Sequence, residues 1–266
     1  MLRNVFLKTL RDQRRALLWW GLGLLGLALY LALFYPSVRD MPELNRLLEE
    51  IPPALMKTLV GDITEFTSPV GYLKSELFFL IAPLLFLIVT IGFGSSAIAG
   101  EEERGTADLL LSNPLPRWRV VVEKFTALVI YTAALAFVFW LGLAIGTVAV
   151  DMDISLGRMA EATFSVVLLG LTFGALALAI GCASGNRGLS MGISSAVAVA
   201  TYFLNSLAPM VKTLEPYRKF SPFYYYIGAD PLQNGLNLGH AAVLIGLTAV
   251  LLVVALLAFE RRDLAV

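Results

Sequence analysis

Six long apolar stretches without a charged residue dominate the sequence. They run from Ala16 to Val38, Leu77 to Gly100, Phe125 to Val150, Ala162 to Asn186, Gly188 to Val211 and Pro231 to Phe259. Each has between 23 and 29 residues, and about 20 suffice for a helix to cross ~30 Å of hydrocarbon. The pattern predicts an all-α membrane protein, one domain over residues 1–266, with spans near 16–36, 77–99, 126–149, 163–183, 189–209 and 240–259.

Composition and charge support this prediction and exclude several classes of function. Hydrophobic residues make up 58% of the chain and charged residues 15%, whereas globular proteins average roughly 45–50% and 25%. Basic and acidic residues balance at 20 each, and no loop forms the basic stripe with interleaved aromatics that nucleic-acid binding needs. A soluble enzyme is therefore excluded, and a nucleic-acid partner has no support in the sequence.

Two single residues limit the chemistry further. Cys182 and His240 are the only cysteine and the only histidine. No intrachain disulfide and no zinc motif with several Cys or His ligands can form from them. Most zinc and thiol chemistry is thereby removed, and we expect no catalytic residue, no metal site and no cofactor on this chain.

The distribution of basic residues predicts the orientation of the spans. With the N-terminus inside, the inner segments carry 12 Lys and Arg in about 47 residues, and the outer segments carry 8 in 68. Positive residues favour the cytoplasmic side. The sequence therefore predicts a multi-pass protein of the cell (plasma or inner) membrane with both termini in the cytoplasm.

A short segment before the first span has amphipathic spacing. Apolar or small positions recur with the period of a helix, and the basic residues lie mostly off that stripe, which consists of Leu2, Val5, Phe6, Thr9 and Leu10. This pattern is typical of an interfacial helix in the headgroup layer that contacts membrane lipid. A frayed basic tail is the alternative.

The connections between the spans differ in length. Residues 36–76 form an outer segment for which we expect a short helical cap. Residues 209–240 form a second one, in which four consecutive aromatics at 223–226 favour an interfacial or re-entrant element. Residues 184–188 instead predict a tight hairpin that makes the fourth and fifth spans antiparallel neighbours.

The predicted spans contain hydroxyls, amides and small residues but no Asp, Glu, Lys or Arg. An ion-coupled carrier needs ionisable groups at depth, so it is only an alternative function. Gly170 and Gly174 have the spacing at which helix backbones approach closely. The polar side chains either bond between helices or line a translocation path, for which the candidates are Thr90, Ser194, Thr201, Tyr202 and Asn205.

The segment after the second span concentrates charge. Three glutamates at 101–103 are followed by Arg104, by Gly105, which can end a helix, and by Thr106, which can cap a new one. Leucines at 109–111 add a small apolar surface. Such a segment suits docking of another protein or packing on neighbouring helices.

Several motifs resemble those of the ABC type-2 exporter permease family. In order, they are residues 98–106 (IAGEEERGT), 109–114 (LLLSNP), 117–119 (RWR), 123–125 (EKF), 221–225 (SPFYY) and 230–232 (DPL). Their order relative to six spans also matches the family. One departure is Pro116, which stands where the family has a serine, so the hydrogen bond of a serine cap is lost at the helix that follows.

The resemblance implies the transmembrane subunit of an ATP-driven exporter. Permeases of this family form homodimers or heterodimers and are driven by separate nucleotide-binding subunits that hold ATP and Mg. The chain itself has no GxxxxGK[ST] phosphate loop. The resemblance assigns the contact with the ATPase to a cytoplasmic coupling helix, here Glu101, Glu102, Glu103, Arg104, Gly105, Thr106, Leu109, Leu110 and Arg117. A non-transporting membrane scaffold is a further alternative.

Overall fold

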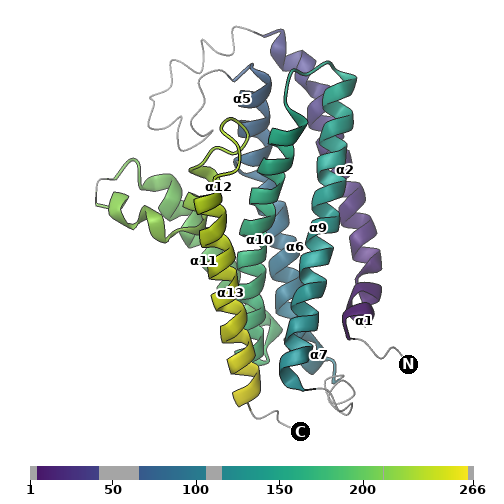
Figure 1. Ribbon diagram of the computed structural model, residues 1–266, viewed down its shortest axis with the longest axis vertical. Coiled ribbons are helices and arrows are strands. Elements are labelled where there is room, and N and C mark those ends of the chain that lie inside the picture. The colour runs from purple at the N-terminus through teal and green to yellow at the C-terminus, as the bar shows by residue number, and fades with distance from the viewer. Residues whose placement is uncertain (1–4, 42–65, 106–115, 212, 263–266) are drawn as a thin grey trace.

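The computed structural model describes residues 5–41, 66–105, 116–211 and 213–262. Within these ranges the regular elements are all helical, and six segments are long and apolar enough to cross a membrane. They stand side by side in a bundle, with α1 and the C-terminal end of α13 at the same end (Figure 1). We call this the terminal end of the bundle and the other the distal end.

Five of the six spans are single helices: α2 (Arg14–Arg39), α9 (Arg117–Ala149), α10 (Leu156–Ser184), α11 (Arg187–Leu207) and α13 (Leu238–Arg261). The second span combines α5 (Pro69–Leu73), the π-helix η1 (Lys74–Phe78) and α6 (Ile81–Ala97). The short helices are α1 (Val5–Asp12), α7 (Ala99–Glu103), the 3-10 helix η2 (Glu215–Phe220) and α12 (Pro222–Ile227). The predicted all-α architecture with six spans is confirmed.

The helices extend beyond the apolar stretches that predicted them. α9 has 33 residues, which at ~1.5 Å per residue gives a length of about 50 Å, compared with ~30 Å of hydrocarbon. All of its charged residues lie in its first eight, from Arg117 to Lys124. We infer that this charged start projects beyond the apolar layer at the terminal end.

α10 lies at the centre of the bundle and contacts α6, α9, α11 and α13 (Figure 1). Most of its apolar residues are buried, including Met159 and Phe173. α2, α11 and α13 bury much smaller shares of theirs and expose large side chains such as Trp19 and Phe203. These three helices provide most of the surface available to lipid or to another subunit.

Glycines bring the backbones of α6 and α10 into contact. A Cβ built on Gly94 lies 2.2 Å from the carbonyl oxygen of Gly174, and one built on Gly170 lies 3.2 Å from Thr90 Cγ2. Small residues allow such an approach in membrane helices, where dispersion forces hold neighbouring helices together. The close approach predicted for Gly170 and Gly174 is therefore present.

A predicted hairpin and a predicted helix stop are also present. Gly185 has a φ of +64°, the left-handed conformation that ends helices, and the Asn186 side chain accepts a hydrogen bond from the backbone N–H of Leu189 at the start of α11. Gly105 has a φ of +65° and directly follows Arg104, the C-cap of α7. The hairpin between α10 and α11 and the helix stop at Gly105 are thus confirmed.

Short helices and an ion pair close the distal end. α12 packs on α10, α11 and α13, and its Tyr226 hydroxyl donates to the carbonyl oxygen of Phe78. Burial raises the pKa of Tyr226 well above its usual value, so the phenol keeps the proton that it donates. Lys74 pairs with Asp230 and joins η1 to the segment after α12. The helical cap expected in the first outer segment falls on residues 43–60, outside the described ranges.

We predict that Gly94→Ala destabilises the bundle. The added methyl group meets a backbone oxygen that cannot rotate away, so α6 and α10 must separate, and overpacking typically costs about 1–3 kcal/mol. Gly92→Ala is the matched control, because nothing lies within 4 Å of a Cβ at that position. Thermal unfolding of the two variants in detergent measures the difference. Equal unfolding midpoints would contradict the backbone contact.

Candidate functional site: the charged cluster around α7

α7 is a short helix that follows α6 at the terminal end and carries three consecutive glutamates. An α-helix has 3.6 residues per turn, so neighbouring side chains project about 100° apart. Glu101, Glu102 and Glu103 therefore point in three directions. Each of their carboxylates meets a different part of the molecule.

Glu101 is buried and faces α9. One carboxylate oxygen lies 3.0 Å from Lys124 Nζ, and the other lies 3.5 Å from Lys8 Nζ on α1. The side chains of Glu101 and Lys124 are only 7% and 4% exposed. Because water is largely excluded, each charge of this pair depends on the other for compensation. The pair links α7 to α9, and Lys8 adds α1.

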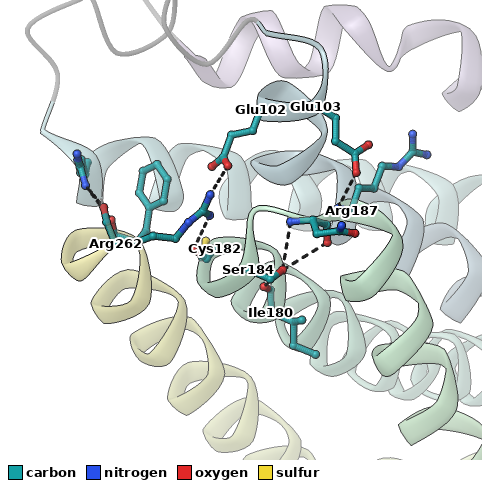
Figure 2. Close-up of polar contacts among 10 residues, drawn as sticks. Glu102, Glu103, Ile180, Cys182, Ser184, Arg187 and Arg262 are labelled. Carbon is teal, nitrogen blue, oxygen red and sulfur yellow. Dashed lines mark hydrogen bonds and ion pairs between the residues drawn. The ribbon is translucent and has the colours of Figure 1, made fainter. Parts of the chain in front are cut away.

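Glu102 faces the end of α13. Its carboxylate pairs with Arg262, the residue that follows this helix, and Arg262 Nη1 also donates to the carbonyl oxygen of Cys182 on α10 at 3.1 Å (Figure 2). Arg117, the first residue of α9, donates to the carbonyl oxygen of Arg262 at 2.7 Å. Arg262 therefore joins α7, α9 and α10 at the point where α13 ends.

Glu103 faces the start of α11. Its carboxylate accepts a hydrogen bond of 2.9 Å from the backbone N–H of Arg187, the first residue of that helix (Figure 2). The first N–H groups of a helix lack partners within the helix, and the helix dipole is positive there. A carboxylate at this position satisfies one such donor and stabilises the terminus by roughly 0.3–1 kcal/mol.

The other predicted coupling residues divide into two groups. Arg104 folds back on α7, where its Nε donates to the carbonyl oxygen of Gly100 at 2.8 Å, and Arg117 lies across the cluster at the start of α9. That start follows Pro116 and has no side-chain cap, as the sequence predicts. Thr106, Leu109 and Leu110 lie outside the described ranges.

An apolar groove of about 380 Å³ lies between α6 and α11. Its walls include Leu84 and Ile88 of α6 and Ser195 and Tyr202 of α11, and Tyr202 is the one predicted path residue that lines it. The groove is open to the surface of the bundle through the poorly buried α11. It can accept an apolar molecule or the side chains of another subunit.

The remaining predicted path residues lie apart from this groove. Thr90 is fully buried, bonds to the carbonyl oxygen of Phe86 and packs against the glycines of α10. Ser194 is also fully buried. Thr201 bonds to the carbonyl oxygen of Val197, and Asn205 accepts a 3.0 Å hydrogen bond from Arg218. The five residues do not converge on a common site.

Comparison with known proteins agrees with this architecture. The family model described as ABC-2 family transporter protein matches residues 3–264, almost the whole chain. The chain belongs to the ABC-2 transporter family. A search of curated proteins gave no match. The resemblance to type-2 permeases is confirmed, and the chain is a multi-pass membrane transport protein of a family whose permeases are not themselves catalytic.

The described part of this ABC-2 protein offers no metal centre. Over residues 5–41, 66–105, 116–211 and 213–262, no three His, Cys, Asp or Glu side chains gather in a way that could hold an ion. The contacts described within the cluster are ion pairs and hydrogen bonds.

The partners of the three glutamates are absent from the residues predicted for the site: Lys8, Lys124, Arg187 and Arg262. The positions of two of these partners, Lys124 and Arg187, could have indicated the contacts. Glu101 and Lys124 are the charged residues that border two apolar stretches, and Arg187 is the single charge between two others. Charges at one hydrocarbon border of adjacent spans lie at the same depth and can meet.

We predict strong energetic coupling between Glu101 and Lys124 in the ABC-2 protein. Glu101→Leu leaves the buried Lys124 uncompensated, and such a loss costs about 3–5 kcal/mol. The double variant Glu101→Leu/Lys124→Met removes both charges and is expected to be more stable than Glu101→Leu alone. Unfolding in detergent of both single variants and the double variant completes the cycle. A loss of stability in the double variant that equals the sum of the losses in the two single variants would contradict the coupling.

Proposed function

We propose that this ABC-2 protein is the transmembrane subunit of an ATP-driven exporter and is moved by a separate ATP-binding-cassette subunit that contacts α7. The observation that carries the proposal is the charged cluster. It links α7 directly to α1, α9, α11 and the residue after α13, and through Arg262 to α10. A partner that displaces α7 therefore acts on several spans at once.

ATP and Mg are held by the partner in this proposal. The permease sequence has no phosphate loop, and nothing in the described cluster resembles one. Glu103, Arg104 and Gly105 are exposed at the end of α7 and offer charge and backbone groups for contact with the partner. Binding and hydrolysis of ATP then shift the spans between two arrangements, because the partner favours one arrangement over the other.

The terminal end faces the cytoplasm of the cell (plasma or inner) membrane in this proposal. ATP is available there, and the segments that meet at this end carry the larger share of the basic residues. α1 then lies in the headgroup layer, with Val5 and Thr9 buried and Leu7 exposed. Both termini are cytoplasmic.

The translocation path follows the groove between α6 and α11 and is completed by a second permease copy or paralogue. The apolar lining of the groove and the exposed face of α11 support this part of the proposal. An exposed apolar surface rimmed by polar residues commonly marks an interaction site.

We predict opposite labelling of the two ends in sealed cells. Cys182 is the only cysteine and is buried, so Cys182→Ala gives a background for single-cysteine variants. Lys219→Cys should react with a membrane-impermeant maleimide, and Trp118→Cys, at a position that is 50% exposed, should react only after lysis. The reverse pattern would contradict the orientation.

We predict that ATP changes the accessibility of the groove when the ATPase is present. In the Cys182→Ala background, Ser195→Cys reports the groove, and Leu238→Cys, far along the chain and 77% exposed, is the control. The chain is co-expressed with the ATP-binding-cassette subunits of its own source, purified and reconstituted. Labelling of Ser195→Cys should change with ATP and Mg, and Glu102→Ala should abolish that response while ATP hydrolysis continues.

Two results would contradict the proposed function. The first is that no ATP-binding-cassette subunit associates with the permease. The second is that labelling of Ser195→Cys in the complete complex is the same with and without ATP. If labelling still responds to ATP in the Glu102→Ala variant, the ATPase partner is supported but the Glu102 contact is not needed for coupling.

A further inference from the structure

A polar cavity of about 270 Å³ opens at the terminal end, between α1, α6, α7, α9 and the start of α11. This volume is large enough for several water molecules or a small polar group. The ionisable residues of its lining are Asp12, Glu101, Arg104, Lys124 and Arg187. Neither the proposed docking of an ATPase nor the groove between α6 and α11 requires this space.

The sequence places this cavity at the border of the hydrocarbon layer. Gln13 precedes the first charge-free stretch by three residues, and Glu101 directly follows the second. Lys124 directly precedes the third stretch, and Arg187 separates the fourth from the fifth. The spans therefore leave the apolar layer at the level of the cavity, which is the depth of phospholipid headgroups.

The charges of the lining favour an anion. Three cations, Arg104, Lys124 and Arg187, stand against two carboxylates, Asp12 and Glu101. Glu101 is already bound by Lys124 and by Lys8. The lining thus has one positive charge in excess, which matches the single negative charge of a phosphodiester.

The side chains of Arg104 and Arg187 both line the cavity and pass close to Gly100. Arg187 Cδ and Arg104 Nη2 lie 3.7 Å and 3.8 Å from the position of a Cβ built on Gly100. Among the residues that the structure describes, no carboxylate forms an ion pair with either guanidinium. Guanidinium groups bind phosphate through paired N–H donors. Arg104 uses its Nε for the carbonyl oxygen of Gly100, and its terminal N–H groups and the guanidinium of Arg187 can donate to an anion in the cavity.

We propose that this cavity binds the phosphate group of an anionic phospholipid with a single negative charge, and that Arg104 and Arg187 are the main donors. The lipid enters from the headgroup layer between α1 and α7. The Gln13 side-chain amide provides a further polar contact on the α1 side. The proposal depends neither on an ATPase partner nor on the direction of transport.

Native mass spectrometry of the purified chain tests the proposal with phosphatidylglycerol and phosphatidylcholine as probes. Wild-type protein should retain phosphatidylglycerol in preference to phosphatidylcholine. Arg104→Gln/Arg187→Gln should lose most of that preference, with a loss of about fivefold for each arginine. Arg187→Lys keeps the charge and should retain part of the preference, and Lys219→Gln, on η2, should behave like the wild type.

Two outcomes would overturn the proposal. Equal retention of phosphatidylglycerol by the wild type and the double arginine variant would remove the site. Binding of inorganic phosphate that depends on both arginines, without preference for phosphatidylglycerol, would show that the ligand is a free phosphate compound. Unfolding midpoints in phosphatidylcholine micelles establish that all variants are folded, which the exposure of both arginines favours.

Discussion

The buried ion pair between Glu101 and Lys124 is the contact on which the terminal end of the bundle depends. Both side chains are almost completely buried, so separation of the pair leaves the charge of Lys124 without its carboxylate partner. The pair therefore fixes the rotation of α7 relative to α9. Once Glu101 faces α9, the geometry of a helix directs Glu102 toward the end of α13 and Glu103 toward the start of α11. One buried contact thus sets the direction of two others.

The bundle combines a closely packed centre with outer helices whose apolar side chains are largely exposed. α6 and α10 touch through Gly94 and Gly174 and cannot separate without loss of packing. α11 and α13 bury few of their apolar residues, and at the terminal end both are attached to α7 through a carboxylate. This arrangement suits a transport protein in which a partner moves peripheral helices relative to a stiff pair. The polar cavity beside α7 places a lipid-binding site at the same level.

The sequence predicts the spans well because their limits follow from a single physical requirement. A helix cannot carry uncompensated charge through hydrocarbon, so six charge-free stretches give six spans. The length of a helix is not set by the length of the charge-free stretch, because backbone hydrogen bonding can continue beyond the hydrocarbon. α9 accordingly starts at Arg117, whereas the predicted span starts at 126. The roles of three glycines were predictable for two reasons. Gly170 has the spacing of small residues that lets helix backbones approach closely. Gly105 and Gly185 stand where a helix ends, and glycine readily adopts the left-handed conformation found there. The partners of the glutamates were not, because Arg262 lies 160 residues from Glu102 and its pairing depends on how the spans pack.

Amide hydrogen exchange in three single variants tests most directly whether α7 connects the outer helices. Glu102→Ala should accelerate exchange only at the end of α13, and Glu103→Ala only at the start of α11, because each removes one contact. Glu101→Ala should accelerate exchange at the start of α9 and, because it frees the rotation of α7, in both of the other segments as well. Peptides from the centre of α10 serve as the internal reference. Exchange that rises only within α7, or that rises in the same segments for all three variants, would contradict the account.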